Sequence, residues 1–383
     1  MSHGIWDNTG ILPSQGPGQF ICTCNVFLQS CDILAQGNFL SFFWHQYGAA
    51  PSASHCPGLS QPLGSRFCIS PARVQKNLHR PLHSAHLSAD HPADMSRPPI
   101  KIVSGMPILG PFAENWANVQ RFQAREDDIM INTYPKSGTT WMSEILDLIL
   151  NDGDLKKASR GAIFERVPFL EYAVPDMPTG TEILDTMKTR RLIKSHLHVE
   201  LVPQSFWEKN CKVIYVARNP KDVLVSYYHF YQMAIVHPDP GTFDEFLQGF
   251  MEGTLAFGSW SRHVKGWWNI REQKNVLFLF FEDMLEDSKR AIKKVAEFIG
   301  KDLPNDVLEK IQQHTTFKAM KENKMSNYST IPSSVMNHGI SPFMRKGICG
   351  DWKNHLTVAQ NEIFDAYLKK ELSGIDLTFR FQD

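Results

Sequence analysis

The stretch TYPKSGTTW, residues 133–141, constrains the fold more than any other part of this 383-residue chain. An apolar run, Ile129-Met130-Ile131, precedes it, and apolar residues at helical spacing follow it at Met142, Ile145, Leu146 and Ile149. This order predicts a buried strand, a tight loop and then an amphipathic helix. In α/β folds, ligands collect in loops at the carboxyl ends of the strands. The sequence therefore predicts an α/β protein with a functional loop that leads into a helix.

Runs with strand and helix character alternate from about residue 100 onward. The strand-like runs cover residues 128–133, 192–194, 212–217 and 276–281. The helical periods cover residues 139–150, 221–233, 242–251, 288–299 and 307–314. Strands that alternate with helices form a mainly parallel sheet covered by helices. We therefore predict one α/β domain over residues 95–383, with a central mainly parallel sheet flanked by helices and a P-loop-like loop.

Residues 1–94 differ in composition from the rest of the chain. They contain few Lys and Arg, many Gly, Pro, Ser and His, and no sustained helix or strand period. Such a composition is typical of segments that cannot form a packed core. We expect an atypical, mostly disordered N-terminal extension, without the paired Cys and His spacing of a zinc site. Met95 is a candidate start of the folded part, and loss of folding or activity in a chain that begins there would contradict this.

The overall charge excludes a general affinity for polyanions. Lys plus Arg and Asp plus Glu both number 40, so no net field favours nucleic acid or a membrane surface. No run of about 18 apolar residues could span a membrane, and the first residues lack the order of a signal peptide. Cys211 and Cys349 stand alone in the sequence, which indicates reduced thiols. We therefore expect a cytoplasmic protein.

The loop at residues 134–141 has the chemistry of an anion cradle. Gly138 allows the backbone to approach an anion, Ser137 adds a hydroxyl donor and Lys136 adds a positive charge. The order differs from G-x-x-x-x-G-K-[ST], because the lysine precedes the glycine and no glycine-rich lead is present. A plain helix N-cap would explain Ser and Thr here, but not a lysine where acidic residues are favoured. We therefore predict that the loop binds a phosphate-like anion.

Three more stretches carry candidate functional groups. In RRLIKSHLH, Lys194 and His196 project from the same side of an extended chain, and histidine is the usual proton acceptor near neutral pH. A lone histidine after a strand can also be a surface or capping residue. Arg218 ends the next strand and offers a planar fork suited to phosphate. The fourth stretch, SPFMRKG at 341–347, has two adjacent cations before a glycine, although a solvated basic turn would look the same.

Together these stretches resemble the cytosolic sulfotransferases, which transfer sulfuryl groups to phenols, steroids and amines. The resemblance runs from about Ile100 to Asp383, and it rests on TYPKSGTTW, KSH, YVARNPKDVLVSYYHF and SPFMRKG in this order. It implies the sulfate donor 3′-phosphoadenosine-5′-phosphosulfate (PAPS) and a small hydroxyl or amine acceptor. It also implies a homodimer and no metal, no nucleic acid and no membrane.

The resemblance also implies roles for individual residues. His196 would be the catalytic base, with Lys194 and Lys136 beside the transferred group. The residues implied to bind the donor's 5′-phosphosulfate are Lys136, Ser137, Gly138, Thr139, Thr140 and Trp141. Those implied at its 3′-phosphate are Arg218, Ser226, Arg345, Lys346 and Gly347, and Phe343 and Met344 of the same stretch are also implied to bind the donor. Those implied elsewhere in the donor site, mainly beside the adenine, are Phe281, His314, Thr315, Thr316, Phe317 and Met320.

The acceptor site and the dimer contact follow from the same resemblance. The implied acceptor-binding residues are Phe112, Phe169, Tyr172, Lys194, Ser195, His196, Phe230, Val236, His237, Tyr328, Val335 and Met336. A dimer contact is implied at Lys353, Thr357, Val358 and Glu362, although a helix that begins with Thr357 as its N-cap is also compatible with these residues.

Three residues depart from the family pattern. Phe281 stands where the family usually has tyrosine, so one hydrogen bond to the donor is expected to be lost. Ser195 replaces a threonine, and His198 replaces a proline beside the base, which affects the expected substrate range. These departures leave open a catalytically weak nucleotide-binding paralogue. A small-molecule kinase is a further alternative, but it would need a glycine-rich lead and an acidic ligand for magnesium.

Overall fold

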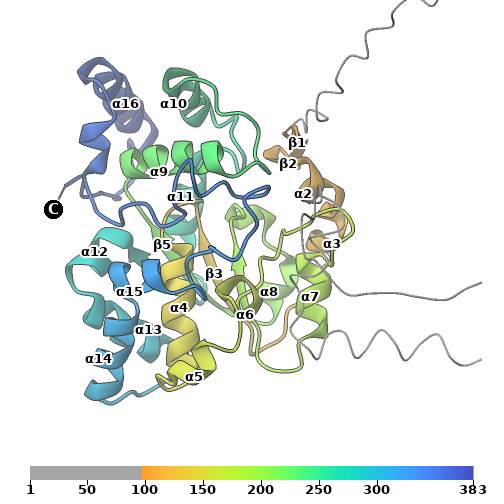
Figure 1. Cartoon of the computed structure of the whole chain (residues 1–383). Coiled ribbons are helices and arrows are strands. Elements are labelled where there is room, and N and C mark those ends of the chain that lie inside the picture. Colours follow the sequence, from red (N-terminus) through yellow and green to blue (C-terminus); the bar gives the residue numbers. More distant parts are fainter. Residues whose placement is uncertain (1–96, 383) are drawn as a thin grey trace, which may run out of the picture. The chain divides into compact units, whose positions relative to one another are not determined.

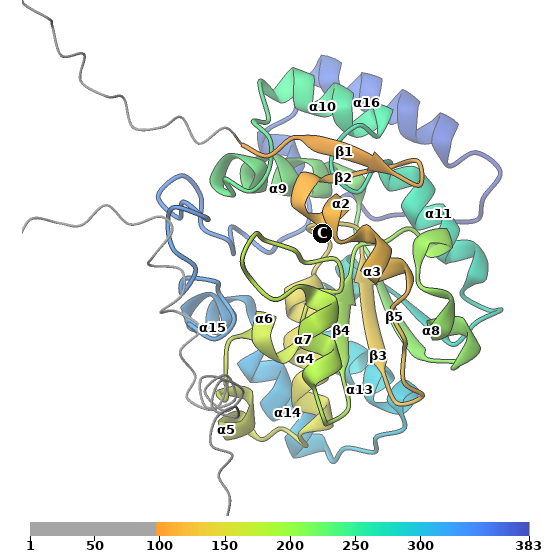
Figure 2. The same ribbon diagram turned by 90° about the vertical axis from the view of Figure 1, so that its right-hand side faces the viewer.

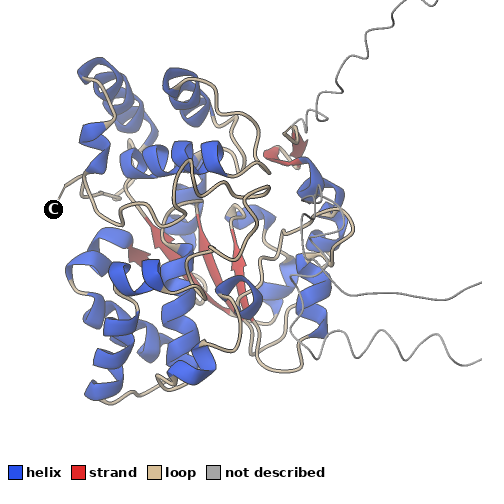
Figure 3. Cartoon of the chain, in the orientation of Figure 1, coloured by secondary structure: helices blue, strands red, loops and turns tan. Residues whose placement is uncertain are grey.

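The computed structural model describes residues 97–382, so the predicted extension over residues 1–94 lies outside the described residues. At the centre is a four-stranded parallel sheet in the order β4-β3-β5-β6 (Figure 3). Its strands are β3 (Ile129–Thr133), β4 (Leu192–Ser195), β5 (Lys212–Ala217) and β6 (Val276–Phe280). A separate antiparallel hairpin comprises β1 (Ile100–Val103) and β2 (Met106–Leu109). The predicted α/β class with a parallel central sheet is confirmed.

Helices cover both faces of the sheet because its strands are apolar on both sides. In β5, Val213 and Tyr215 belong to one buried cluster, and Ile214 and Val216 belong to another. The second cluster includes α4 (Thr139–Leu150), α13 (Ser288–Ile299) and α14 (Asn305–His314). The first includes α9 (Pro220–Met233), α10 (Phe243–Glu252), α11 (Trp260–Ile270) and α16 (Val358–Glu371). Figure 1 shows these two helical groups on opposite sides of the strands.

Shorter elements connect the main ones. They are α2 (Gly110–Glu114), α3 (Trp116–Gln120), α5 (Leu155–Ala158), α6 (Ile163–Arg166), α7 (Gly180–Thr186), η1 (Val199–Leu201), α8 (Gln204–Glu208), α12 (Phe281–Glu286), α15 (Phe317–Glu322) and η2 (Asp351–Asn354). Figure 2 shows the β1–β2 hairpin across one end of strands β3, β4 and β5. A hydrogen bond of 2.8 Å from the Phe257 amide to the Pro107 carbonyl connects the hairpin to the loop after α10.

Most predicted boundaries agree with the structure. The helices predicted at 139–150 and 288–299 and the strand predicted at 212–217 have the observed bounds. The strand predicted at 276–281 is one residue too long, because Phe281 begins α12. Within residues 97–382, no helix is both long and apolar enough to cross a membrane.

Candidate active site

Three loops meet at the carboxyl edge of the sheet because β3 pairs with both β4 and β5. The register places Asn132 beside Ser195, and Thr133 beside Val216. The chain segments that leave β3, β4 and β5 therefore start at the same edge. This arrangement brings the predicted anion loop, the predicted base and Arg218 into one site.

The anion loop has an unusual backbone. Lys136 has φ 68° and Gly138 has φ 101°, both in the left-handed region that favours glycine. Gly138 is the N-cap of α4 and offers no side chain to the first helical amides. A Cβ on Gly138 would lie 2.9 Å from Cδ2 of Phe281, so glycine is also required by this close approach. The loop thus leaves the positive end of α4 open to an anion.

Lys136 is held among aromatic rings and other cations. Its Nζ lies 4.3 Å from the ring centroid of Phe230 and 4.5 Å from that of Phe343. Desolvation, together with the charges of Arg218 and Arg345, lowers the pKa of Lys136 to about 7. A bound anion would stabilise the protonated amine. The lysine is therefore suited to a site that receives negative charge.

His196 is oriented by the end of β3. Its Nδ1 lies 2.7 Å from the carbonyl oxygen of Thr133. Because a carbonyl only accepts hydrogen bonds, Nδ1 carries the hydrogen, and Nε2 is left as the proton acceptor. The Thr133 hydroxyl lies 2.6 Å from that of Thr139, which connects the base to the anion loop. Lys194, the other predicted catalytic cation, donates to the Tyr328 hydroxyl at 2.9 Å.

A buried carboxylate beside the base was missed in the sequence. Glu171 Oε1 accepts hydrogen bonds from the Ser195 hydroxyl and the His196 amide, both at 2.8 Å. Burial outweighs the opposing effects of these hydrogen bonds and of the Lys194 charge, and it raises the pKa of Glu171 to about 7. The segment before Glu171 pairs with β4 through the Leu170 amide and the Lys194 carbonyl. Glu171 therefore fixes the backbone of the loop that carries the base.

Arg218 bridges two of the predicted donor-binding loops. Its guanidinium donates to the carbonyls of Lys136 and Ile348, both at 3.0 Å, and lies 4.3 Å from the ring centroid of Phe281. Arg345 and Lys346 both pair with Asp351, at 2.6 and 2.5 Å. The basic turn at 341–347 is therefore anchored, not free in solvent, and it lies against the anion loop.

The residues predicted beside the adenine also meet the basic turn. A Cβ on Gly347 would lie 2.2 Å from Cδ2 of Phe317, so these two residues are in close contact. Thr316 is the N-cap of α15, and the Thr315 hydroxyl donates to the Ile311 carbonyl at 2.9 Å. Met320 is buried, and Ser226 lies half-buried on α9. Thr315, Thr316 and Met320 therefore each have a structural role in this part of the fold, whether or not they contact a ligand.

Besides Nε2 of His314, which lies near Glu144, four buried polar atoms in the predicted donor site lack a hydrogen-bond partner among the described residues. They are Ser137 Oγ, Trp141 Nε1, Arg218 Nε and Arg345 Nε. All four can donate a hydrogen, and a buried donor without a partner is costly. Phosphate and sulfate oxygens are acceptors, so these residues fit a donor such as PAPS.

Aromatic side chains surround His196 on one side. The Phe169 ring centroid lies 5.1 Å from that of His196, and Phe112 lies 5.6 Å from Phe169. Tyr172 extends this group at 6.3 Å from Phe112. Phe257 lies 5.2 Å from His196 and was missed in the sequence, which gives no local signal for it. The predicted acceptor residues on this side are therefore close to the base.

The other predicted acceptor residues lie on the side of Lys136 and Lys194. Tyr328 stacks on Phe343 at 4.0 Å, and Phe230 lies 6.1 Å from Phe343. The Ile235 amide donates a hydrogen bond to the Val335 carbonyl at 3.0 Å. This bond joins the segment that contains Val236 and His237 to the segment that contains Val335 and Met336. The structure thus brings distant predicted residues to the two sides of the base and the lysines.

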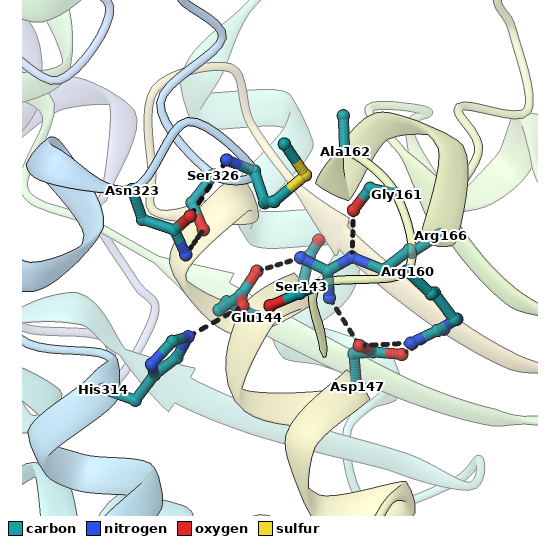
Figure 4. Close-up of polar contacts among 12 residues, drawn as sticks. Ser143, Glu144, Asp147, Arg160, Gly161, Ala162, Arg166, His314, Asn323 and Ser326 are labelled. Atoms are coloured by element: carbon teal, nitrogen blue, oxygen red, sulfur yellow. Dashed lines mark hydrogen bonds and ion pairs between the residues drawn. The ribbon is translucent and has the colours of Figure 1, made fainter. Parts of the chain in front are cut away.

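A buried ion network lies behind the anion loop, on α4 (Figure 4). Arg166 bonds Glu144 at 2.6 Å and also pairs with Asp147. Arg160 pairs with Asp147 at 2.5 Å, and His314 Nε2 lies 3.5 Å from Glu144. Arg166, Glu144 and Asp147 are each at most 4% exposed. The network therefore connects the helix of the anion loop to α6 and to the end of α14.

The residues of the predicted dimer contact are exposed. Val358 is 76% exposed, and Thr357, Lys353 and Glu362 also face solvent. Thr357 is the N-cap of α16 and accepts a hydrogen bond from the Gln360 amide. The alternative role of Thr357 as a helix N-cap is thus confirmed, and the dimer contact stays a prediction.

Comparisons with known proteins agree with this site. The model of the sulfotransferase domain matches residues 126–376. Sulfotransferase 1A1 of Bos taurus is 55% identical over 289 residues, which cover 76% of this chain and 98% of the relative. Sulfotransferase 1 family member D1 of Mus musculus is 52% identical over 291 residues, 76% of this chain and 99% of the relative.

Solved structures are similar as well. A mouse sulfotransferase complexed with PAP is 32% identical with a TM-score of 0.61, and the match covers 72% of this chain and 96% of that one. Retinol dehydratase in complex with androsterone and the inactive cofactor PAP is 26% identical with a TM-score of 0.66, over 73% of this chain and 92% of that one.

Proposed function

We propose that His196, Lys136 and Lys194 carry out the reaction of this chain, which belongs to the cytosolic sulfotransferase 1 family. The chain is a PAPS-dependent transferase that sulfates small phenolic or steroid acceptors. The observation that most supports the proposed roles is the convergence of the anion loop and His196, linked through Thr133 and Thr139. The proposed transferase domain covers residues 95–383.

In this mechanism each residue acts on one part of the transfer. PAPS supplies an activated sulfuryl group. Nε2 of His196 would accept the proton of the acceptor hydroxyl while the acceptor oxygen bonds to sulfur and the bond from sulfur to the departing phosphate oxygen breaks. Lys136 stabilises the negative charge that develops on the departing phosphate oxygen, as fixed cations do in phosphoryl transfer. Lys194, whose amine donates to the Tyr328 hydroxyl, would stabilise the transferred group.

Transfer itself is tested with radiolabelled PAPS, 4-nitrophenol and a panel of steroids. We expect labelled sulfate esters to form without added metal. Binding of adenosine 3′,5′-bisphosphate without any transfer would favour a weak nucleotide-binding paralogue. Phosphorylation of the same acceptors by ATP would favour a kinase.

The acceptor is proposed to be flat and apolar. Phe112, Phe169 and Tyr172 form an edge-to-face aromatic group that ends at His196. Aromatic walls with few polar groups suit small apolar ligands. The complexes of retinol dehydratase with androsterone and with retinol support acceptors of this kind for this chain as well.

Arg218→Ala is expected to weaken binding of adenosine 3′,5′-bisphosphate by about 1.5–3 kcal/mol, the range for hydrogen bonds to charged groups. Arg218 has one guanidinium donor without a partner among the described residues, and it lies beside the anion loop. Titration calorimetry measures the affinity. Arg190→Ala is the control, because Arg190 is about half exposed and pairs only loosely with Asp127, at 3.8 Å. Equal affinity in Arg218→Ala and wild type would contradict the proposed 3′-phosphate site.

We also propose a homodimer formed through the start of α16. Val358 is 76% exposed and lies in the segment that resembles the family's dimer contact, between Lys353 and Glu362. Val358→Glu should therefore dissociate the dimer, because it places a charge in an apolar contact. Sedimentation equilibrium measures the association, with the exposed Lys369→Glu at the other end of the helix as control. A wild-type protein that sediments as a monomer at micromolar concentration would contradict the proposal.

A further inference from the structure

His198 is a buried residue next to the catalytic loop that the mechanism above does not use. It is 3% exposed and stands where the family pattern has a proline. Its Nε2 lies 2.8 Å from the carbonyl oxygen of Phe257. Because that carbonyl only accepts, Nε2 carries the hydrogen and donates it. Burial lowers the pKa of His198, in keeping with a neutral donor. Proline at this position would have no side-chain donor for Phe257.

Phe257 is held in a strained conformation by its backbone contacts. It has φ 67°, which is uncommon for a bulky residue. Its amide donates to the Pro107 carbonyl at 2.8 Å, and its carbonyl accepts from His198. The next carbonyl, of Gly258, accepts from the Tyr134 hydroxyl at 2.9 Å. Hydrogen bonds from three directions thus keep this segment in place.

The ring of Phe257 lies in the acceptor site. Its centroid is 5.2 Å from that of His196 and 6.2 Å from that of Phe169, and the residue is only 3% exposed. The position of this ring therefore limits the space beside the base. A shift of the Phe257 backbone would move this wall relative to His196.

His198 also contacts the other side of the catalytic loop. Its ring lies 5.0 Å from that of His263. His263 Nε2 lies 3.1 Å from the carbonyl oxygen of His196, and its Nδ1 lies 2.8 Å from the Tyr215 hydroxyl. The side chain of His198 is thus packed between the segment that carries the base and the segment that carries the wall.

We infer that His198 is a positioning residue that determines acceptor specificity by fixing Phe257 beside His196. This inference rests on the proposed function and concerns only the acceptor side of the site. His198 acts through its hydrogen bond to the Phe257 carbonyl. Its hydrogen bond to Phe257 sets the distance between the Phe257 ring and His196. A proline has no side-chain donor for that bond.

The test compares variants that remove or keep the donor at position 198. His198→Pro fits the backbone, since φ of His198 is −58° and proline requires about −65°. His198→Leu removes the donor with similar volume, and His198→Gln keeps an N–H at a similar reach. We expect His198→Pro and His198→Leu to weaken binding of 4-nitrophenol about fivefold to tenfold, within the range for the loss of one aromatic contact, because the Phe257 ring is no longer held beside the bound phenol. His198→Gln should keep most of the wild-type affinity for 4-nitrophenol.

Binding is measured by calorimetry on protein saturated with adenosine 3′,5′-bisphosphate, and the ratio of steroid to phenol kcat/KM is measured in parallel. We expect that ratio to rise in the proline and leucine variants, with the affinity for the bisphosphate unchanged. Unchanged phenol binding and an unchanged ratio in both variants would overturn the inference. Loss of bisphosphate binding in the wild type would contradict the proposed function instead.

A double-mutant cycle with Phe257→Ala separates positioning from a general structural role. If His198 acts through the Phe257 ring, His198→Leu should have little further effect on phenol binding once that ring is removed. Equal effects of His198→Leu with and without the ring would overturn the inference. Thermal unfolding of every variant is recorded, and if His198→Leu does not fold, the comparison of His198→Gln with His198→Pro decides the result.

Discussion

Replacement of His196 by alanine is expected to lower kcat by about 10²–10⁴-fold, the usual contribution of a general base. The Nδ1 hydrogen of this imidazole is committed to the Thr133 carbonyl, at 2.7 Å, so Nε2 is the nitrogen that can accept the acceptor's proton. Alanine removes that nitrogen. The donor-binding loop on α4 keeps its own contacts, so affinity for adenosine 3′,5′-bisphosphate should stay close to wild type. Single-turnover kinetics and calorimetry measure the two quantities separately.

The environment of His196 predicts the direction of its pH dependence. Desolvation, together with the charges of Lys194 and Lys136, lowers its pKa to about 3, against the opposing effect of the hydrogen bond to Thr133. The imidazole is therefore neutral and able to accept a proton at neutral pH, and activity is lost only as the pH falls through the lowered pKa. Negative charge bound between the two lysines would offset their effect and raise the pKa, which makes the base stronger when the site is filled.

The matched variant is His196→Asn. Its amide nitrogen can keep the hydrogen bond to Thr133 at the position of Nδ1, but asparagine has no nitrogen that accepts a proton. We expect kcat of His196→Asn to be as low as that of His196→Ala. Recovery of activity in the asparagine variant would mean that His196 orients the loop without acting as the base.

Local pattern was sufficient for the central part of the fold. The strand at 212–217 and the helix at 139–150 were predicted with their observed bounds, because an apolar run and a helical period are set by nearby residues. The strand at 276–281 was predicted one residue too long because every residue from Val276 to Phe281 is apolar, so the pattern contains no end signal. The four-residue strands of the β1–β2 hairpin are too short for a clear period.

The site residues that the sequence missed depend on long-range contacts. Glu171 contacts Ser195 and the His196 amide across 24 and 25 residues of sequence. Phe257 contacts His196 from the loop after α10, where its backbone has a positive φ. Neither feature has a local sequence pattern. His198, by contrast, was recognised as a departure from the family pattern, but its partner Phe257 became known only from the fold.

Arg166→Ala is expected to have the largest effect on stability, a loss of about 3–5 kcal/mol in the free energy of unfolding. The guanidinium of Arg166 is the shared partner of Glu144 and Asp147, and it also donates to the Gly161 carbonyl at 2.9 Å (Figure 4). All three charged side chains are almost fully buried. Removal of the arginine leaves two carboxylates in a region of low dielectric constant, with Arg160 still paired to Asp147. Urea denaturation followed by circular dichroism measures the loss.

Two further variants test whether the loss of stability arises from the burial of the charged groups. Arg190→Ala removes an arginine whose pair with Asp127 is about half exposed, and such surface pairs contribute about 0–1 kcal/mol. The triple variant Arg166→Met, Glu144→Gln and Asp147→Asn removes the buried charges together, so it should be more stable than Arg166→Ala alone. If Arg166→Ala and Arg190→Ala lost equal stability, the buried network would contribute no more than a surface pair. Since Glu144 and Asp147 lie on α4, the helix whose N-cap is Gly138, a large loss would also mean that the anion loop depends on an ion network outside the donor site.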